Sequence, residues 1–534
     1  MTHRERRRGR GPALALAAAV AALAVAPIVA TRPVAAQAAA APAAPAALAG
    51  LDAYVVQALR DWGAPGMAIA VIRNDSVVLA RGYGVRELGK PERVTPRTLF
   101  AIGSTTKAFT AAALAMLVDE GKVKWDDPVT KYLPGFQLHD PFVTREMTVR
   151  DLLTHRSGLA RGDRLWYASG NDRDEVLRRV RFLEPSWSFR STYGYQNIMF
   201  LAAGQVVAAV AKQPWDDFVK ARIFTPLGMR ATVTSTLGLE GQPDAATPHV
   251  RIDGGAPRPV PWRNLDNVGP AGSINSNVAE MAEWVRLQLG RGTYRGAKLL
   301  SPAVVKEMHT PQMVVRMSEE AEKLFPETHL MAYGLAWAIR DYRGRKIVGH
   351  GGAIDGMRAE VALLPEEGLG VVVLTNVDHP SPPTAMVYRV IDSYLAPSTA
   401  GPKDWSARML AATREREGKV AAEAKKVEAA RVAGTKPSLP LERYAGTYAD
   451  SMYGDVVVKA EGGKLVARVG PMYVGALEHW HFDTFRAAWE NPVLGRAYVS
   501  FALDARGQVA SLAIENLAVF GRRPDPSTVR AAGR

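Results

Sequence analysis

The sequence predicts a mixed α/β (α+β) fold: an antiparallel sheet flanked by helices, with a large helical subdomain, followed by a small all-β domain. Two groups of apolar, strand-like runs lie far apart in the chain. The residues between them repeat their apolar positions every three or four residues, which is typical of helices. Strand patterns return after residue 437. We expect the strands that precede the helical stretch to pair with those that follow it, which gives the predicted sheet.

The composition is that of a globular protein. Of the 534 residues, 22% are charged and 47% are hydrophobic, which argues against collagen, a coiled coil or a wholly disordered chain. The sequence contains no cysteine. Thiol nucleophiles, disulfides and thiolate metal sites are therefore excluded, and covalent catalysis would have to use oxygen or nitrogen.

The first 36 residues have the layout of a secretory signal peptide. A basic run from Arg4 to Arg10 precedes an apolar stretch over residues 13–30 and small residues near Ala36. We therefore expect an exported protein, periplasmic or secreted, with no stable membrane span after cleavage. An uncleaved anchor and the choice between the Sec and Tat routes stay open at this point.

Removal of this segment takes away six arginines and one glutamate, which lowers the net charge from +14 to +9. The remaining basic residues are interleaved with acidic ones, so no nucleic-acid partner is expected. A mild attraction to carboxylate-bearing substrates is compatible with the residual charge. Residues 37–50 are rich in Ala and Pro and predict a disordered leader.

Residues 51–396 form the first predicted domain. Apolar runs over 67–73 and 77–81 flank Asn74-Asp75-Ser76, a hairpin signal. Helical periodicity follows, most clearly over 110–120, 197–210 and 278–289. Four more strands are predicted at 334–339, 346–350, 360–364 and 369–375.

The rest of the chain divides into a linker and a second domain. Residues 397–437 are rich in Ala, Glu, Lys and Arg and predict an exposed helical linker. Residues 438–523 alternate apolar and polar side chains between turn signals such as Gly462-Gly463, which predicts a small antiparallel β domain. We expect its aromatic residues to form its core, and it could cover the mouth of a site in the first domain.

A serine and a lysine stand three residues apart where a predicted helix begins. Ser104 and Lys107 would share one face of that helix. The free N–H groups and the macrodipole at the helix start favour a developing negative charge, which suits a nucleophilic serine. A serine N-cap followed by a solvated lysine is the alternative, and this short motif alone is not specific.

Three further segments accompany this pair: Tyr195-Gln196-Asn197, Leu152-Leu153-Thr154-His155-Arg156-Ser157-Gly158-Leu159 and Gly349-His350-Gly351-Gly352. With them, and with Pro270-Ala271-Gly272, the chain resembles the serine β-lactamase and penicillin-binding-protein superfamily over residues 51–395. The resemblance is strongest to its class C β-lactamase-like branch, which includes D,D-peptidases and esterases. The segments follow one another in the order of that family. The resemblance implies a β-lactamase/transpeptidase-like fold.

The resemblance also implies roles for individual residues. Ser104 would be the acylated nucleophile, Lys107 the amine that helps to deprotonate it, and Tyr195 a proton relay to the leaving group. Asn197 would hold Lys107 and a substrate amide. The strand bearing His350, Gly351, Gly352 and Ala353 would line the substrate, with the backbone N–H groups of Ser104 and Ala353 as the oxyanion hole. No metal ion or other cofactor is expected.

The sequence departs from the family at its inner strand. His350-Gly351-Gly352 stands where β-lactamases and D,D-peptidases carry Lys-Thr-Gly, so a permanent ammonium is replaced by an imidazole. This disfavours strong β-lactam hydrolysis. We expect acyl-serine hydrolysis of an ester or amide in a small molecule or short peptide. A penicillin-binding receptor or non-catalytic scaffold is the alternative, and the oligomeric state stays open.

Two other histidine patterns are interpreted as structural. His155 and Ser157 resemble a hydrolase pair, but the G-x-S-x-G elbow is absent because histidine occupies its first position. His479 and His481 lie on one face of a predicted strand without an identifiable third ligand, so a core or surface role is favoured over metal binding.

Overall fold

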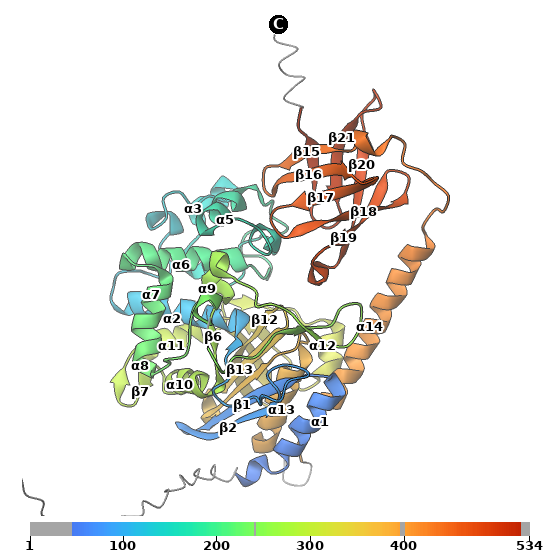
Figure 1. Ribbon diagram of the computed structural model, residues 1–534. Coiled ribbons are helices and arrows are strands. Elements are labelled where there is room, and N and C mark those ends of the chain that lie inside the picture. The colour runs from blue at the N-terminus through green and yellow to red at the C-terminus, as the bar shows by residue number, and fades with distance from the viewer. Residues whose placement is uncertain (1–44, 240–241, 396–400, 525–534) are drawn as a thin grey trace, which may run out of the picture. The chain divides into compact units, whose positions relative to one another are not determined.

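Strands from the two ends of the first domain pair in one antiparallel sheet (Figure 1). β1 (Gly66–Arg73) pairs with β14 (Leu369–Thr375) in a register that places Met67 opposite Thr375. This confirms the long-range closure predicted from the sequence. The strand order is β2-β1-β14-β13-β12-β11-β10-β9. The other strands are β2 (Ser76–Gly84), β9 (Met313–Val314), β10 (Met331–Tyr333), β11 (Ala338–Tyr342), β12 (Arg345–Ile354) and β13 (Met357–Leu364).

The structure, a computed structural model, describes residues 45–239, 242–395 and 401–524. The predicted signal peptide over residues 1–36 lies outside these ranges. Within them, no helix combines the length and the apolar character needed to cross a bilayer. A short 3₁₀ helix, Ala46–Leu48, precedes α1 and buries Leu48. Residues 46–48, which fall within the predicted leader over residues 37–50, are therefore helical, and Leu48 contributes to the core.

The sheet separates two apolar cores, because side chains alternate across its faces. Met67, Ile69 and Val71 of β1 belong to one core with residues of α1 (Leu51–Trp62) and α13 (Ser381–Leu395). Both helices lie beside the sheet in Figure 1. Ala68 and Ala70 face the helical subdomain. The continuous apolar run of β1 follows from this burial on both faces.

One predicted strand is misplaced. Residues 334–339 do not form a single strand, because β10 ends at Tyr333 and β11 begins at Ala338. Gly334 and Trp337 close the turn between them, with the Gly334 N–H donating to the Trp337 carbonyl. Trp337 is buried in the core on the helical side, so this apolar run serves helix packing rather than the sheet.

The helical subdomain is built around two buried helices, α2 (Thr106–Asp119) and α6 (Asn197–Ala211), which contact each other. α10 (Val278–Leu289) packs on β14 and has the predicted bounds. α6 also lies against α9 (Gly269–Gly272), which carries a carbonyl used in the site below. The shorter helices are α3 (Pro141–Glu146), α4 (Val149–Leu152), α5 (Arg173–Arg179), α7 (Trp215–Val219), α8 (Thr225–Leu227), α11 (Pro302–Met308) and α12 (Glu319–Leu324).

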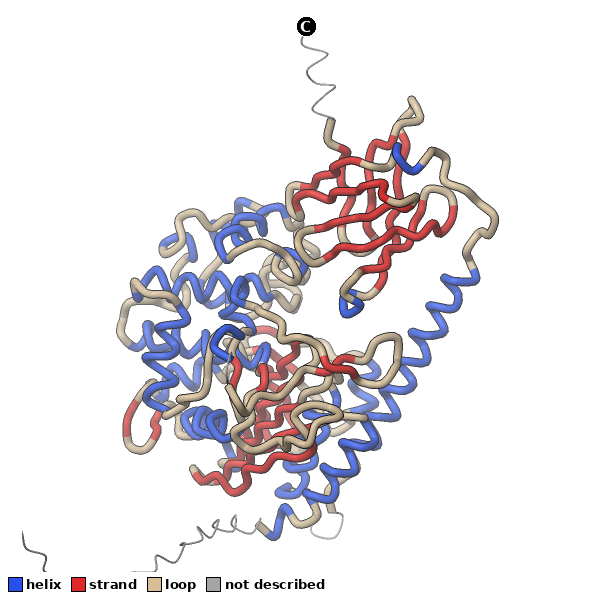
Figure 2. The backbone as a smooth tube through the Cα atoms, viewed as in Figure 1, coloured by secondary structure: helices blue, strands red, loops and turns tan. Residues whose placement is uncertain are grey.

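A long helix leads to the second domain. α14 (Trp405–Ala429) buries Trp405 and Met409 against the first domain, and its residues after Thr413 are exposed. Eight strands then form a closed barrel in which β15 pairs with β22 (Figure 2). This confirms the predicted all-β domain. The strands are β15 (Gly446–Asp450), β16 (Gly454–Glu461), β17 (Lys464–Val469), β18 (Tyr473–His481), β19 (Thr484–Trp489), β20 (Arg496–Leu503), β21 (Val509–Ile514) and β22 (Ala518–Arg522).

Candidate active site

Ser104 lies in a single 3₁₀ turn, Gly103–Thr105, directly before α2. The turn depends on Gly103, whose φ of 50° falls in the left-handed region. A Cβ atom on Gly103 would lie 2.6 Å from the backbone N of Ala353 on β12. This close approach of turn and strand brings the amide of Ser104 and the amide of Ala353 into one corner of the site.

Lys107 is fully buried and its amine is surrounded by oxygen atoms. Its Nζ lies 3.0 Å from Ser104 Oγ, 2.7 Å from Asn197 Oδ1 and 2.8 Å from the Ala271 carbonyl oxygen. None of the described carboxylates forms an ion pair with it. Two of these three partners contact Lys107 through their side chains, Ser104 and Asn197. Both were candidate site residues in the sequence, and the structure brings them together at the Lys107 amine.

Burial lowers the pKa of Lys107 well below its usual value, and the positive charge of Arg161 lowers it further. Asp163 acts in the opposite direction. The neutral amine fits its surroundings, because its two N–H bonds can serve Asn197 and the Ala271 carbonyl while its lone pair accepts the Ser104 proton. Lys107 is thus placed as a base toward Ser104.

Tyr195 completes the group of side chains around Ser104. Burial raises the pKa of its phenol, whereas a hydrogen bond with the Ser104 side chain and the charge of Arg161 lower it. Burial prevails, so the phenol is protonated at neutral pH. The Lys107 amine lies 4.9 Å from the centre of the Tyr195 ring.

The loop that presents Tyr195 and Asn197 is fixed by His155. The His155 Nδ1 accepts a hydrogen bond of 2.9 Å from the Gln196 N–H, and its ring lies 4.2 Å from the Tyr195 ring. Gln196 in turn caps α6 by accepting from the Ile198 N–H. His155 is buried, and its side-chain hydrogen bond among the described residues goes to the Gln196 N–H rather than to Ser104. This agrees with the structural role we favoured from the sequence.

His350 lines the pocket as a neutral ring. Burial and the nearby Lys107 lower its pKa to about 3. In its neutral form Nδ1–H donates to the Gly351 carbonyl at 2.6 Å, and Nε2 accepts from the Tyr333 hydroxyl at 2.9 Å. Both ring nitrogens are thereby engaged within the protein, and this position supplies no cation at neutral pH.

Arg161 and Asp163 are site residues that the sequence did not reveal. The Arg161 guanidinium lies 5.0 Å from the centre of the Tyr195 ring and forms an ion pair with Asp163. Asp163 Oδ1 accepts from Asn197 Nδ2 at 2.9 Å and from the Trp166 indole at 3.0 Å. Arg161, Asp163 and Trp166 lie in a polar loop, and such a pattern is typical of a solvent-exposed segment. The sequence therefore gives no indication that they belong to the site.

Together these side chains surround a cavity of about 240 Å³. Its walls combine the polar groups above with apolar side chains. Within the described part of the chain, no cluster of three or more His, Asp or Glu side chains is arranged to hold a metal ion. The lining residues are Ser104, Arg161, Trp166, Tyr195, Asn197, Leu265, Val268, Ala271, Gly272, His350, Gly351, Ala353 and Ile354.

Comparison with known families assigns both domains. Residues 51–396 match the family model described as Beta-lactamase. Residues 430–527 match a domain of unknown function, DUF3471. The two matches correspond to the sheet-and-helix domain and to the barrel.

Individual proteins resemble the chain over stretches longer than residues 51–396. The Unguisins hydrolase ungD' of Aspergillus campestris is 32% identical over 421 residues, 76% of each chain. The Unguisins hydrolase ungD of Aspergillus violaceofuscus is 31% identical over 470 residues, 81% of each chain. Among solved structures, the octameric penicillin-binding protein homologue from Pyrococcus abyssi superposes with a TM-score of 0.59 at 23% identity, covering 88% of this chain and 99% of that one. The fold likeness thus extends beyond residues 51–396.

Proposed function

Because this chain belongs to the beta-lactamase family, we propose that it is an exported serine hydrolase that forms an acyl-enzyme on Ser104 and hydrolyses an amide or ester. The observation that carries the proposal is the set of three short contacts around the buried Lys107 amine. Export is supported by the basic and apolar segments of the first 36 residues.

Acylation begins with the transfer of the Ser104 proton to the Lys107 amine. A serine hydroxyl is a weak nucleophile at neutral pH and needs such an adjacent base. The Oγ atom attacks the substrate carbonyl carbon, and its oxygen becomes negatively charged. The backbone N–H groups of Ser104 and Ala353 are the donors for this oxyanion. One such donor is typically worth a factor of about 100 to 1000 in rate.

Tyr195 acts next, as the acid for the leaving group. Its protonated phenol gives a proton to the departing nitrogen or oxygen as the C–N or C–O bond breaks, and it regains a proton from the Lys107 ammonium. An amine is a poor leaving group without protonation, so the raised pKa of Tyr195 suits an amide substrate.

Deacylation reverses the proton path. A water molecule gives its proton to Lys107 by way of Tyr195 and attacks the acyl carbon. The Ser104 oxygen leaves and takes the proton back from Lys107. Tyr195 and Lys107 share these protons, so the pH profile reports the pair rather than one residue.

Turnover, rather than mere acylation, is supported by relatives that are themselves hydrolases. The cavity of about 240 Å³ lies below the range of about 300–1,000 Å³ of whole-ligand sites, which favours a small acyl group. The absence of a cation at His350 speaks against β-lactams with an essential carboxylate contact at that position.

A fluorophosphonate probe and a panel of nitrocefin, a short-chain aryl ester and a D-alanyl amide would test the proposal. We expect labelling of Ser104, no labelling of a Ser104→Ala variant, and turnover of the amide or ester well above that of nitrocefin. Labelling without turnover would support a penicillin-binding receptor instead. Equal labelling of the alanine variant would show that Ser104 is not the nucleophile.

A further inference from the structure

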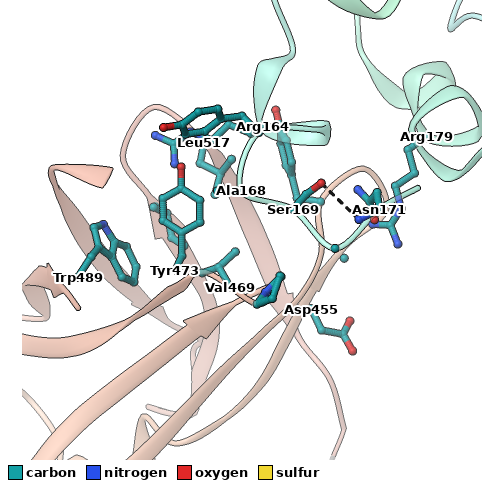
Figure 3. Close-up of a pocket in the computed structure, with 17 residues that line it drawn as sticks. Arg164, Ala168, Ser169, Asn171, Arg179, Asp455, Val469, Tyr473, Trp489 and Leu517 are labelled. Atoms are coloured by element: carbon teal, nitrogen blue, oxygen red, sulfur yellow. Dashed lines mark hydrogen bonds between the residues drawn. The ribbon is translucent and has the colours of Figure 1, made fainter. Parts of the chain in front are cut away.

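A second cavity lies where the barrel meets the loop Asp163–Asn171 of the first domain (Figure 3). The barrel contributes Tyr453, Val469, Tyr473, Trp489 and Leu517 to its lining, and the loop contributes Tyr167. Four of these six side chains are aromatic. A concave aromatic surface beside polar groups is typical of a site that binds an apolar group and fixes its orientation through polar contacts.

The size of the cavity limits what it can hold. Its volume is about 270 Å³, again below the range of about 300–1,000 Å³ for whole-ligand sites. It therefore suits one large side chain of a longer ligand.

The charge at the cavity is positive. The Arg164 guanidinium lies 5.1 Å from the centre of the Tyr473 ring, and it forms no ion pair with any of the described residues. The other charged lining residues are paired: Arg179 shares Glu175 with Arg178, and Asp455 pairs with Arg523 at 2.7 Å. A carboxylate beside the bound side chain would complement Arg164.

A third cavity borders both the barrel cavity and the catalytic one. It has a volume of about 560 Å³ and shares Trp166 with the catalytic cavity. It also shares Ala168, Ser169, Gly170 and Asn171 with the barrel cavity. The three cavities are thus adjacent along residues 166–171, and an extended molecule that follows this segment would contact the catalytic cavity and the barrel together.

We propose that the cavity at the barrel is a remote substrate subsite, which takes a large apolar or aromatic side chain of a peptide whose scissile bond lies at Ser104. This inference rests on the proposed hydrolase function and narrows its substrate class to peptides of several residues. The barrel thereby contributes directly to specificity.

Hexa-alanine peptides in which one phenylalanine, D or L, is moved from position to position would test the proposal. We expect the highest kcat/KM when the phenylalanine is at a fixed place at least two residues from the cleaved bond. Trp489→Ala, which removes an aromatic wall, and Leu517→Trp, which fills the cavity, should each raise KM for that peptide by about tenfold, equivalent to about 1.4 kcal/mol. Arg164→Gln should reduce the preference for a free over an amidated carboxyl end.

Trp480→Ala is the matched control, because Trp480 is a buried tryptophan of the same barrel that lies outside the cavity lining and packs on Tyr498. The proposal requires that Trp489→Ala impair the long peptide about tenfold more than a short aryl ester. Equal losses for peptide and ester, no effect of phenylalanine position, or turnover of the ester without any peptide cleavage would each overturn it. Failure of the hydrolase function itself would look different: no substrate is turned over and Ser104 is not labelled.

Discussion

Lys107 and Arg161 set the charge balance around Ser104. Two positive groups near one another disfavour each other's charged form. The guanidinium therefore lowers the pKa of the Lys107 amine, in addition to the effect of burial. It also lowers the pKa of Tyr195. Arg161, a lining residue of the cavity, thus changes the pKa of Lys107 through charge alone.

Replacement of Arg161 by glutamine should move the acidic limb of the kcat/KM profile to higher pH. Without the guanidinium the pKa of Lys107 rises, so more of the amine is protonated and inactive at a given low pH. We expect a shift of about half a pH unit, since a partly exposed charge is worth about 0.2–1 kcal/mol. Activity should fall more at pH 6 than at pH 9, which a pH series with a short aryl ester would measure.

Arg164→Gln provides the control for this shift. Arg164 lies in the same loop, but its guanidinium is placed over Tyr473 and is not among the groups that shift Lys107. Its profile should coincide with that of the unmodified enzyme. An unmoved acidic limb in Arg161→Gln would show that burial alone sets the protonation of Lys107.

At the scale of elements, the proposed mechanism assigns the position of the oxyanion to the junction between the Ser104 turn and β12. Both partners need glycine. Gly103 approaches Ala353, and a Cβ atom on Gly352 would lie 1.9 Å from the Ile102 carbonyl oxygen. Glycine allows two backbone segments to come closer than any side chain would permit.

Gly103→Ala should lower kcat by about 100-fold or more, because the added methyl group would push β12 away and displace one oxyanion donor. Steady-state kinetics with the aryl ester would measure the loss. Gly121→Ala separates the two causes, since Gly121 has a φ of 69° at the other end of α2 but open space around it. That variant carries only the backbone strain, so a comparable loss of kcat in it would contradict the role of the β12 contact.

Elements with strong local signals could be predicted from the sequence. The α10 helix has the bounds that its periodicity indicated, and the hairpin turn at Asn74 and Asp75 has both residues at positive φ, as such turns require. The strand predicted at 334–339 was wrong, because periodicity cannot distinguish a strand from apolar residues that leave the sheet and pack on helices.

Some side chains of the candidate site could likewise be predicted from the sequence, and others could not. Ser104, Lys107, Tyr195 and Asn197 could be located because their short motifs occur in a fixed order. Asp163 could not, because its contact with Asn197 spans 34 positions and depends on how a polar loop folds. Closure of the barrel could not be predicted from local sequence patterns either, because it depends on pairing between the first strand, β15, and the last, β22.

At the scale of the whole molecule, the loop Asp163–Asn171 links the barrel to the catalytic group. Its first residue holds Asn197, while Ala168 is buried within the apolar core of the barrel. Between them, the Tyr167 hydroxyl donates to Asp355 at the tip of the hairpin that follows Ala353. Asp355 also accepts from Arg263, which contacts Met472 of the barrel. The barrel therefore contacts the loop directly through Ala168, and it contacts the end of β12 through Arg263 and Asp355.

Ala168→Asp should separate the loop from the barrel, because it places a carboxylate against the apolar core of the barrel, where the charge loses hydration. We expect kcat for a short aryl ester to fall about 10- to 100-fold, since small misplacements of catalytic groups are that costly. Hydrogen exchange in residues 163–171 should rise in parallel. Ala510→Asp, on an exposed position of the same barrel, is the matched control and should change neither quantity. Faster exchange in the loop without any loss of kcat would mean that Asp163 holds Asn197 without help from the barrel, and that the second domain acts on substrate binding alone.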